Sequence, residues 1–313
     1  YYQSTDVPPG QGFKYSAKIN TTGLDEAIAS TQYSRFQYLM EGQDALVFGY
    51  GTPEAKPVTV SFWVKSAVAG KYPLSIEVPD GYRICVKSYT IDRQDTWEHK
   101  VVTFPPLTSS GVTVGSTTDL GWKLTMPLVV GSAYHDDANE GKWRTDGAYR
   151  MGLSGCANPF RASGDIWFMT GVQIEVGSHA TPFEHRTYGE ELALCQRYYY
   201  RITNNHAVNQ NLCMGVVADT DDVFGVMDMP VTMRVPPSVT ASAAASFRVT
   251  TIFGSGGSQN CSQLVLGYDG QAHVTIKARG NGGGFTAGQA KLIGFNETVG
   301  LAYIDFNAEI PSQ

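Results

Sequence analysis

The chain has 313 residues, a length that suggests about two domains. Hydrophobic residues make up 42% and charged residues 17%, which excludes a disordered chain and a coiled coil. The net charge is −6 and no run of Lys or Arg occurs, so neither nucleic-acid binding nor a polybasic membrane patch is expected. No apolar stretch approaches the roughly 20 residues of a membrane-spanning helix.

The first half of the chain carries six short segments with strand patterns. In residues 58–64 the apolar side chains of every second residue alternate with more polar ones, which is typical of a half-buried strand. Turn residues separate this segment from strands predicted at 74–78, 82–89, 97–104, 122–130 and 166–176. Such a series without alternating helices favours a sandwich or jelly roll, with Trp97 and Trp122 in its core.

The second half begins with one predicted helix at 189–197, which has acidic residues at its start and Arg197 at its end. Further short strands are predicted at 198–202, 212–218, 223–229, 246–253, 264–268, 273–278, 291–295 and 302–308. We therefore expect an all-β chain with three parts: a jelly-roll β-sandwich at 1–186, a short helix and connector at 187–203, and a smaller β-sandwich-like domain at 204–313.

Motifs for catalysis and metal binding are absent from the sequence. It has no Gly-x-Ser-x-Gly, His-Glu-x-x-His, Walker loop or dinucleotide fingerprint, so we expect no enzymatic activity and no cofactor. Five widely spaced Cys predict buried free thiols. The acidic segments 135–137 and 219–222 lack the Gly and Glu placement of a calcium loop. They are expected to be solvated loops, and a structural calcium is the alternative.

Four residues are candidates for a ligand site, because sugar recognition needs an aromatic ring beside polar groups. Trp63 and Lys65 lie on the polar face of the 58–64 strand, where the alternative is that Trp63 packs under a loop or at a subunit contact. Gln173 and Glu175 point outward whether or not Thr170 and its neighbour form a β-bulge. Val172, Ile174 and Val176 are then expected to point inward, and only Trp167 depends on the bulge. The loop around Trp143 and Tyr149 is either a binding rim or a simple connection.

Several long motifs resemble a module of tail fibre and tail proteins from tailed bacteriophages. They are residues 55–65 (AKPVTVSFWVK), 95–104 (DTWEHKVVTF), 168–178 (FMTGVQIEVGS), 180–186 (ATPFEHR) and 188–199 (YGEELALCQRYY). They occur in the same order as in that module and span most of residues 1–200. Residues 204–313 are more loosely similar to the terminal β-domain of such proteins. Strands that usually precede residues 3–9 in this family are missing, so the chain is expected to be a fragment.

The resemblance implies a jelly-roll domain like a carbohydrate-binding module and a trimeric virion protein. The partners it implies are host-surface polysaccharide or lipopolysaccharide and other virion proteins. Multivalent, non-covalent glycan binding at the particle surface is the function we expect. The alternatives are a capsid or tail decoration protein with a purely structural role, and an ancillary domain of a polysaccharide depolymerase.

Overall fold

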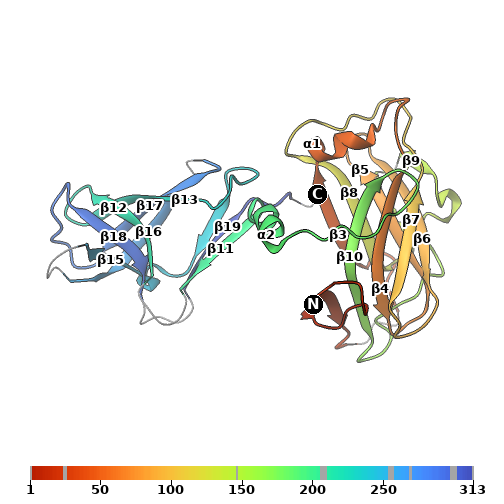
Figure 1. Cartoon of the computed structure of the whole chain (residues 1–313), viewed down its shortest axis with the longest axis horizontal. Coiled ribbons are helices and arrows are strands. Elements are labelled where there is room, and N and C mark those ends of the chain that lie inside the picture. Colours follow the sequence, from red (N-terminus) through yellow and green to blue (C-terminus); the bar gives the residue numbers. More distant parts are fainter. Residues whose placement is uncertain are drawn as a thin grey trace. The chain divides into compact units, whose positions relative to one another are not determined.

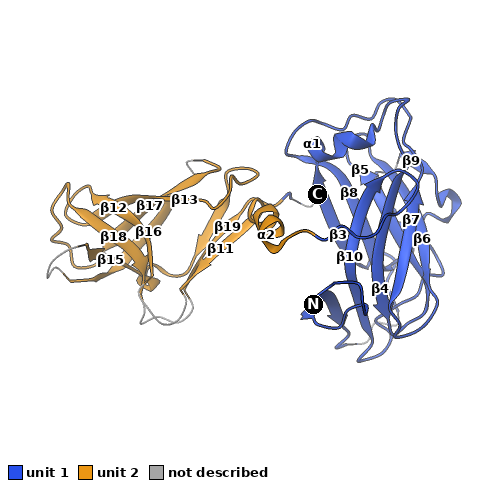
Figure 2. Cartoon of the chain, in the orientation of Figure 1, with its two compact units in different colours: residues 1–185, 310–313 blue, residues 186–309 orange. Residues whose placement is uncertain are grey.

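The computed structural model describes residues 2–23, 27–145, 147–204, 210–252, 257–267, 270–296 and 302–311. The chain divides into two compact units, residues 1–185 with 310–313, and residues 186–309 (Figure 2). Both units consist almost wholly of antiparallel strands with a few short helices, so the predicted all-β class is confirmed (Figure 1). Among the described residues no helix is both long and apolar enough to cross a lipid bilayer.

Unit 1 is a sandwich of two five-stranded antiparallel sheets. The first sheet has the order β1 (Tyr2–Ser4), β2 (Ser16–Asn20), β10 (Ile166–Val176), β4 (Val58–Ser66) and β7 (Glu98–Phe104). The second has the order β3 (Tyr33–Glu41), β8 (Leu120–Val130), β5 (Gly70–Val78), β6 (Arg83–Ile91) and β9 (Trp143–Thr145). The short helix α1 (Gly42–Ala45) follows β3.

The sandwich core comes from the alternation of side chains along the central strands. Val58, Val60, Phe62 and Val64 of β4 are fully buried, and they belong to one cluster with Trp122 of the opposite sheet. All six strands predicted for this half are present. The predictions missed β1, β2, β3 and the three-residue β9, where short or mixed polar sequences give no clear period-two pattern.

A β-bulge interrupts β10, as the Thr170–Gly171 pair suggested. The pairing register with β4 shifts between Thr170 and Gln173, and Gly171 has a φ of 62°, which favours glycine. The bulge turns Trp167 into the core, where it is 1% exposed. Val172, which lies in the bulge, is exposed rather than buried. Val176 pairs with the buried Val58 and so faces inward as predicted, but it is exposed because it ends the strand.

Unit 2 contains a closed barrel and a separate small sheet. The barrel order is β12 (Asn211–Val217), β13 (Asp222–Asp228), β17 (His273–Gly280), β16 (Gln259–Gly267), β15 (Phe247–Thr251) and β18 (Ala290–Phe295). The small sheet has the order β11 (Tyr199–Thr203), β19 (Tyr303–Asn307) and β14 (Ser238–Ala241). The sequence predicted a sandwich-like unit, whereas six of the strands form a closed barrel. The pattern could not distinguish the two, because side chains alternate with a period of two in both folds.

The helix predicted at 189–197 is α2 (Tyr188–Gln196). Thr187 caps it: its side chain accepts from the Glu190 N–H, and the Glu190 carboxylate accepts from the Thr187 N–H at 3.0 Å. The second unit starts at Arg186, so the predicted connector 187–203 belongs to it as α2 and β11. The final residues of the strands predicted at 246–253 and 264–268 lie outside the described residues.

Candidate functional site

The four sequence-predicted residues lie together on the outward face of the first sheet. Trp63 pairs with Thr170 in the register of β4 and β10, while Gln173 and Glu175 of β10 lie beside Ser61 and Thr59. On its other side, Trp63 contacts the ring of His99 of β7 at a centroid distance of 5.1 Å. Two strands predicted independently thus present their candidate residues to one surface.

The chain itself occupies the polar groups of Gln173 and Glu175. Glu175 accepts hydrogen bonds from the Thr181 hydroxyl at 2.5 Å and from the Thr181 N–H at 3.1 Å. The Gln173 side-chain oxygen accepts from the Glu184 N–H at 2.8 Å. Burial acts to raise the pKa of Glu175, but the bonds from Thr181 and Gln173 hold it below its usual value. Both residues therefore fasten a strap, residues 177–185, onto the sheet.

A second strap, residues 5–15, crosses the same face from the N-terminal side. Phe13 lies over the bulge, where a Cβ on Gly171 would collide with its ring. Its ring also contacts Phe183 and His185 of the other strap, at centroid distances of 4.9 and 5.1 Å. The absence of a side chain at Gly171 thus lets the two straps join over the sheet.

Lys65 is held by an ion pair inside a small aromatic cluster. Its ammonium bonds the Asp6 carboxylate and lies 4.5 Å from the ring centroid of Phe168 and 5.5 Å from that of Trp97. The Trp97 indole N–H donates to the same carboxylate at 2.9 Å. Burial tends to raise the pKa of Asp6, and the bonds from Lys65 and Trp97 outweigh it and lower the pKa.

This cluster corrects the expectation that both Trp97 and Trp122 are core residues. Trp122 is fully buried, whereas Trp97 lies half-buried on the outward face, where its N–H finds the Asp6 carboxylate. Trp97 stands between Thr96 and Glu98, and its indole is placed by the partner that its N–H can bond. That partner is 91 residues away. The first face is therefore largely covered by the chain's own segments.

The chain between β8 and β10, residues 131–145 and 147–165, is called here the crossing segment. It forms β9 at the edge of the second sheet and also packs on the outward face of that sheet. Its Met151 and Leu153 pack on Ile84 and Val86 of β6 in a second small apolar cluster. Arg144 within it forms an ion pair with Asp136. This packing buries Ile84 and Val86, which face outward from the sheet.

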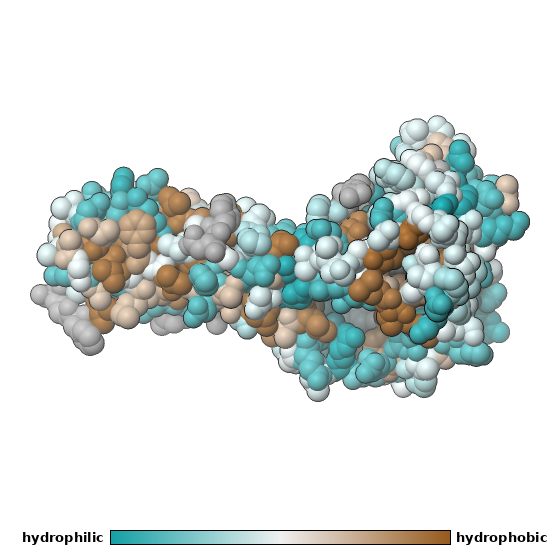
Figure 3. Space-filling model, turned by 90° about the horizontal axis from the view of Figure 1, so that it is seen from above, coloured by the Kyte–Doolittle hydropathy of each residue, from teal (hydrophilic) through white to brown (hydrophobic). Residues whose placement is uncertain are grey.

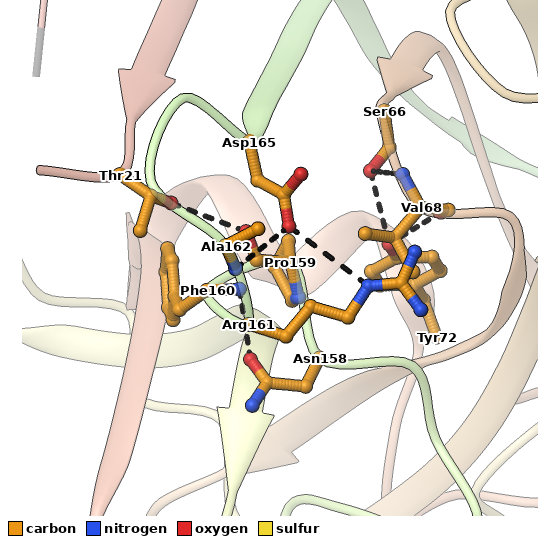
Figure 4. A network of polar contacts seen from close by, with 10 residues as sticks. All are labelled: Thr21, Ser66, Val68, Tyr72, Asn158, Pro159, Phe160, Arg161, Ala162 and Asp165. Atoms are coloured by element: carbon orange, nitrogen blue, oxygen red, sulfur yellow. Dashed lines mark hydrogen bonds and ion pairs between the residues drawn. The ribbon is translucent and has the colours of Figure 1, made fainter. Parts of the chain in front are cut away.

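Polar contacts fix the end of the crossing segment to the rim of the sandwich (Figure 4). The Thr21 hydroxyl donates to the Pro159 carbonyl at 3.1 Å. Asp165 accepts from the Ala162 N–H at 3.1 Å and lies 3.9 Å from Arg161 Nε. The segment therefore enters β10 from a defined turn. The contact of Thr21 with Pro159 could not be predicted from the sequence, because the two residues are 138 positions apart.

Near the other end of the second sheet, a charged pair is buried beneath an aromatic ring. Lys123 Nζ of β8 lies 3.0 Å from a Glu77 carboxylate oxygen of β5, with side chains 4% and 8% exposed. The Tyr149 ring of the crossing segment lies over Lys123, with 5.5 Å between Nζ and the ring centroid. Neither charged residue was singled out from the sequence, since single charges in strands carry no pattern of their own.

The acidic segments have partners within the chain. Asp137 accepts from the Ser154 N–H at 2.8 Å, and Asp219 accepts from the N–H groups of Asp221 and Asp222, both at 2.8 Å. In the described part of the chain, no three His, Cys, Asp or Glu side chains gather as a metal site would require.

All five cysteines lie among the described residues and are free thiols. Cys85 and Cys261 are buried, but the expectation of burial is wrong for Cys195, which is exposed on α2.

Comparison with known proteins adds no relative: no protein-family model matches the chain, and no curated protein matches it.

Proposed function

We propose that this chain is a tail fibre or receptor-binding component of a bacteriophage virion that recognises a host-surface polysaccharide or lipopolysaccharide. Binding is non-covalent and multivalent, with several copies of unit 1 presented together by contacts between copies of unit 2. The observation that carries this proposal is an apolar patch on the outside of the barrel, which suits assembly of identical chains.

This barrel patch consists of Met214 and Val216 of β12 and Phe224 and Val226 of β13. Their exposed fractions lie between 41% and 63%. Val216 and Phe224 are directly paired, and the same register brings Met214 beside Val226. Figure 3 shows apolar residues gathered on the surface of both units. Contiguous apolar surface of this kind marks protein contacts more often than scattered single residues do.

A homotrimer is the assembly that we propose, following the family resemblance of the sequence. In a closed three-fold ring each copy contacts both neighbours, and patches that lie near the axis meet on all three copies. Weak binding of one sugar site then becomes firm attachment, because the second and third sites engage at high effective concentration. Other virion proteins complete the attachment to the particle.

A decoration protein with a purely structural role is the second candidate. The straps over the first sheet favour it, because they occupy Gln173, Glu175 and Lys65 with contacts inside the chain. A protein whose outward polar groups were all occupied by contacts within the chain would have no receptor site.

Binding of the full chain to an array of purified bacterial O-antigens and capsular polysaccharides distinguishes these functions. Retention of the chain on a subset of the array at micromolar concentration supports receptor binding, whereas no retention on any of them contradicts it. Release of new reducing ends from a retained polysaccharide would instead indicate the depolymerase alternative.

A further inference from the structure

Two tyrosines of unit 1 have an unusual backbone conformation. Among the described residues, three other than glycine have a positive φ: Tyr82 at 51°, Asp95 at 53° and Tyr149 at 52°. For bulky residues this conformation is strained and persists where the surroundings hold it. Two of these three residues are tyrosines beside the second sheet, Tyr82 between β5 and β6 and Tyr149 after β9.

The two tyrosines come from different segments and belong to the same end of the second sheet. Tyr149 lies over Lys123, which pairs with Glu77. Tyr82 is one residue before Arg83, which pairs with Val78 beside Glu77. Tyr82 is in the hairpin between β5 and β6, where its N–H donates to the Pro79 carbonyl at 3.0 Å, and its side chain is 53% exposed. Tyr149 is in the crossing segment. Burial raises the pKa of Tyr149, and the nearby Glu77 and Tyr82 raise it further.

Charged groups lie beneath the ring of Tyr149. The Lys123 ammonium sits under its ring, and Glu77 neutralises that ammonium. Farther along β8, the Gln37 side-chain amide donates to the Thr125 hydroxyl at 3.1 Å. A cation beneath an aromatic face fixes the ring, so Tyr149 is prepared before a ligand arrives.

From this placement we infer that Tyr82 and Tyr149 form a binding platform for a neutral pyranose unit of a glycan. This inference rests on the proposed function and names the surface that performs it. The apolar C–H face of a sugar ring packs on a tyrosine ring, and the phenol hydroxyls bond its hydroxyls. Glu77 neutralises Lys123 beneath the Tyr149 ring, and the net charge of −6 on the chain disfavours an acidic polysaccharide, so the ligand inferred is neutral.

The test measures the affinity of the full chain and its variants for whichever neutral polysaccharide of the array retains the unmodified protein. Tyr82→Ala and Tyr149→Ala are each expected to weaken binding about tenfold, because each removes one ring of the platform. Tyr149→Phe keeps the ring and should retain most of the binding. Tyr188→Ala is the matched control, since Tyr188 is 82% exposed on α2 and outside unit 1.

Folding is checked in each variant by tryptophan fluorescence during urea unfolding. All five Trp lie between residues 63 and 167, so this signal reports unit 1. Full binding by both alanine variants would overturn the platform and leave the proposed function standing. Retention on acidic polysaccharides alone would overturn the ligand class. An array that retains no protein would overturn the proposed function, and the platform with it.

Discussion

The two units differ in whether their own segments cover their outward surfaces. Unit 1 covers both of its sheets with its own segments: two straps on one face and the crossing segment on the other. Unit 2 closes six strands into a barrel, fills the interior with side chains such as Ile276 and Phe295, and leaves the barrel patch bare. Unit 1 needs no partner to cover these faces, whereas a unit with uncovered apolar surface is stabilised by contact with its copies.

Barrel closure also changes the reason for expecting assembly. The alternating apolar runs of residues 204–313 are a pattern that would leave strand edges open for symmetry mates to cover. The six barrel strands have no such edges, since each pairs on both sides. The barrel is therefore expected to contact other copies through side chains on its outside rather than through added strands.

The largest expected effect comes from placing a charge in the barrel patch. The double change Phe224→Asp and Val226→Asp should dissociate the full chain to monomers, because burying carboxylates in a contact is strongly unfavourable. Sedimentation velocity measures the mass. Val101→Asp is the matched control, since Val101 is an exposed valine of unit 1. An unchanged assembly in the barrel variant would show that the patch is not the contact.

The buried pair of unit 1 predicts the next largest effect. Lys123→Met leaves the Glu77 carboxylate buried without its partner and should lower the free energy of unfolding by about 3–5 kcal/mol. The double change with Glu77→Leu should recover most of that loss, because two apolar groups need no partner. Urea unfolding followed by tryptophan fluorescence measures both. Equal losses in the single and double variants would contradict the account.

A smaller loss of stability is expected when the strap of residues 177–185 is detached from the first sheet. Glu175→Ala removes the bonds to Thr181 and should lower the stability of unit 1 by about 1–2 kcal/mol, with faster amide exchange at Thr181. Glu184→Ala is the control, since the Glu184 contact to Gln173 uses its backbone N–H. Slow exchange at Thr181 in the Glu175 variant would mean that the strap is held by other contacts.

The smallest effect is a pH dependence at Asp6. Its pKa is lowered from 3.8 in the folded chain, so its contribution to stability is complete above that value and is lost as the pH falls through the folded pKa. Asp6→Asn should therefore show a shallower loss of stability than the natural chain below pH 3.8. Tryptophan fluorescence follows the transition, since Trp97 is bonded to Asp6. Parallel curves for the two proteins would show that Asp6 carries no linked proton.

Local patterns predicted more of this molecule than its long-range contacts. Period-two alternation placed β4 and the outward residues Trp63, Lys65, Gln173 and Glu175 on the strands where they lie. It could not show that Thr181 and Asp6 would occupy their polar groups, because those partners come from segments without a pattern. The pairing of Tyr82 with Tyr149 depends likewise on the path of the crossing segment, and only the fold brings them together.

The central claim is that contacts between copies of unit 2 assemble the chain into a homotrimer. Light scattering of the unmodified full chain at micromolar concentration tests this claim most directly. The account predicts a single species of about three times 34.0 kDa. A monodisperse monomer of 34.0 kDa would contradict it, because multivalent attachment would then have no basis in this chain.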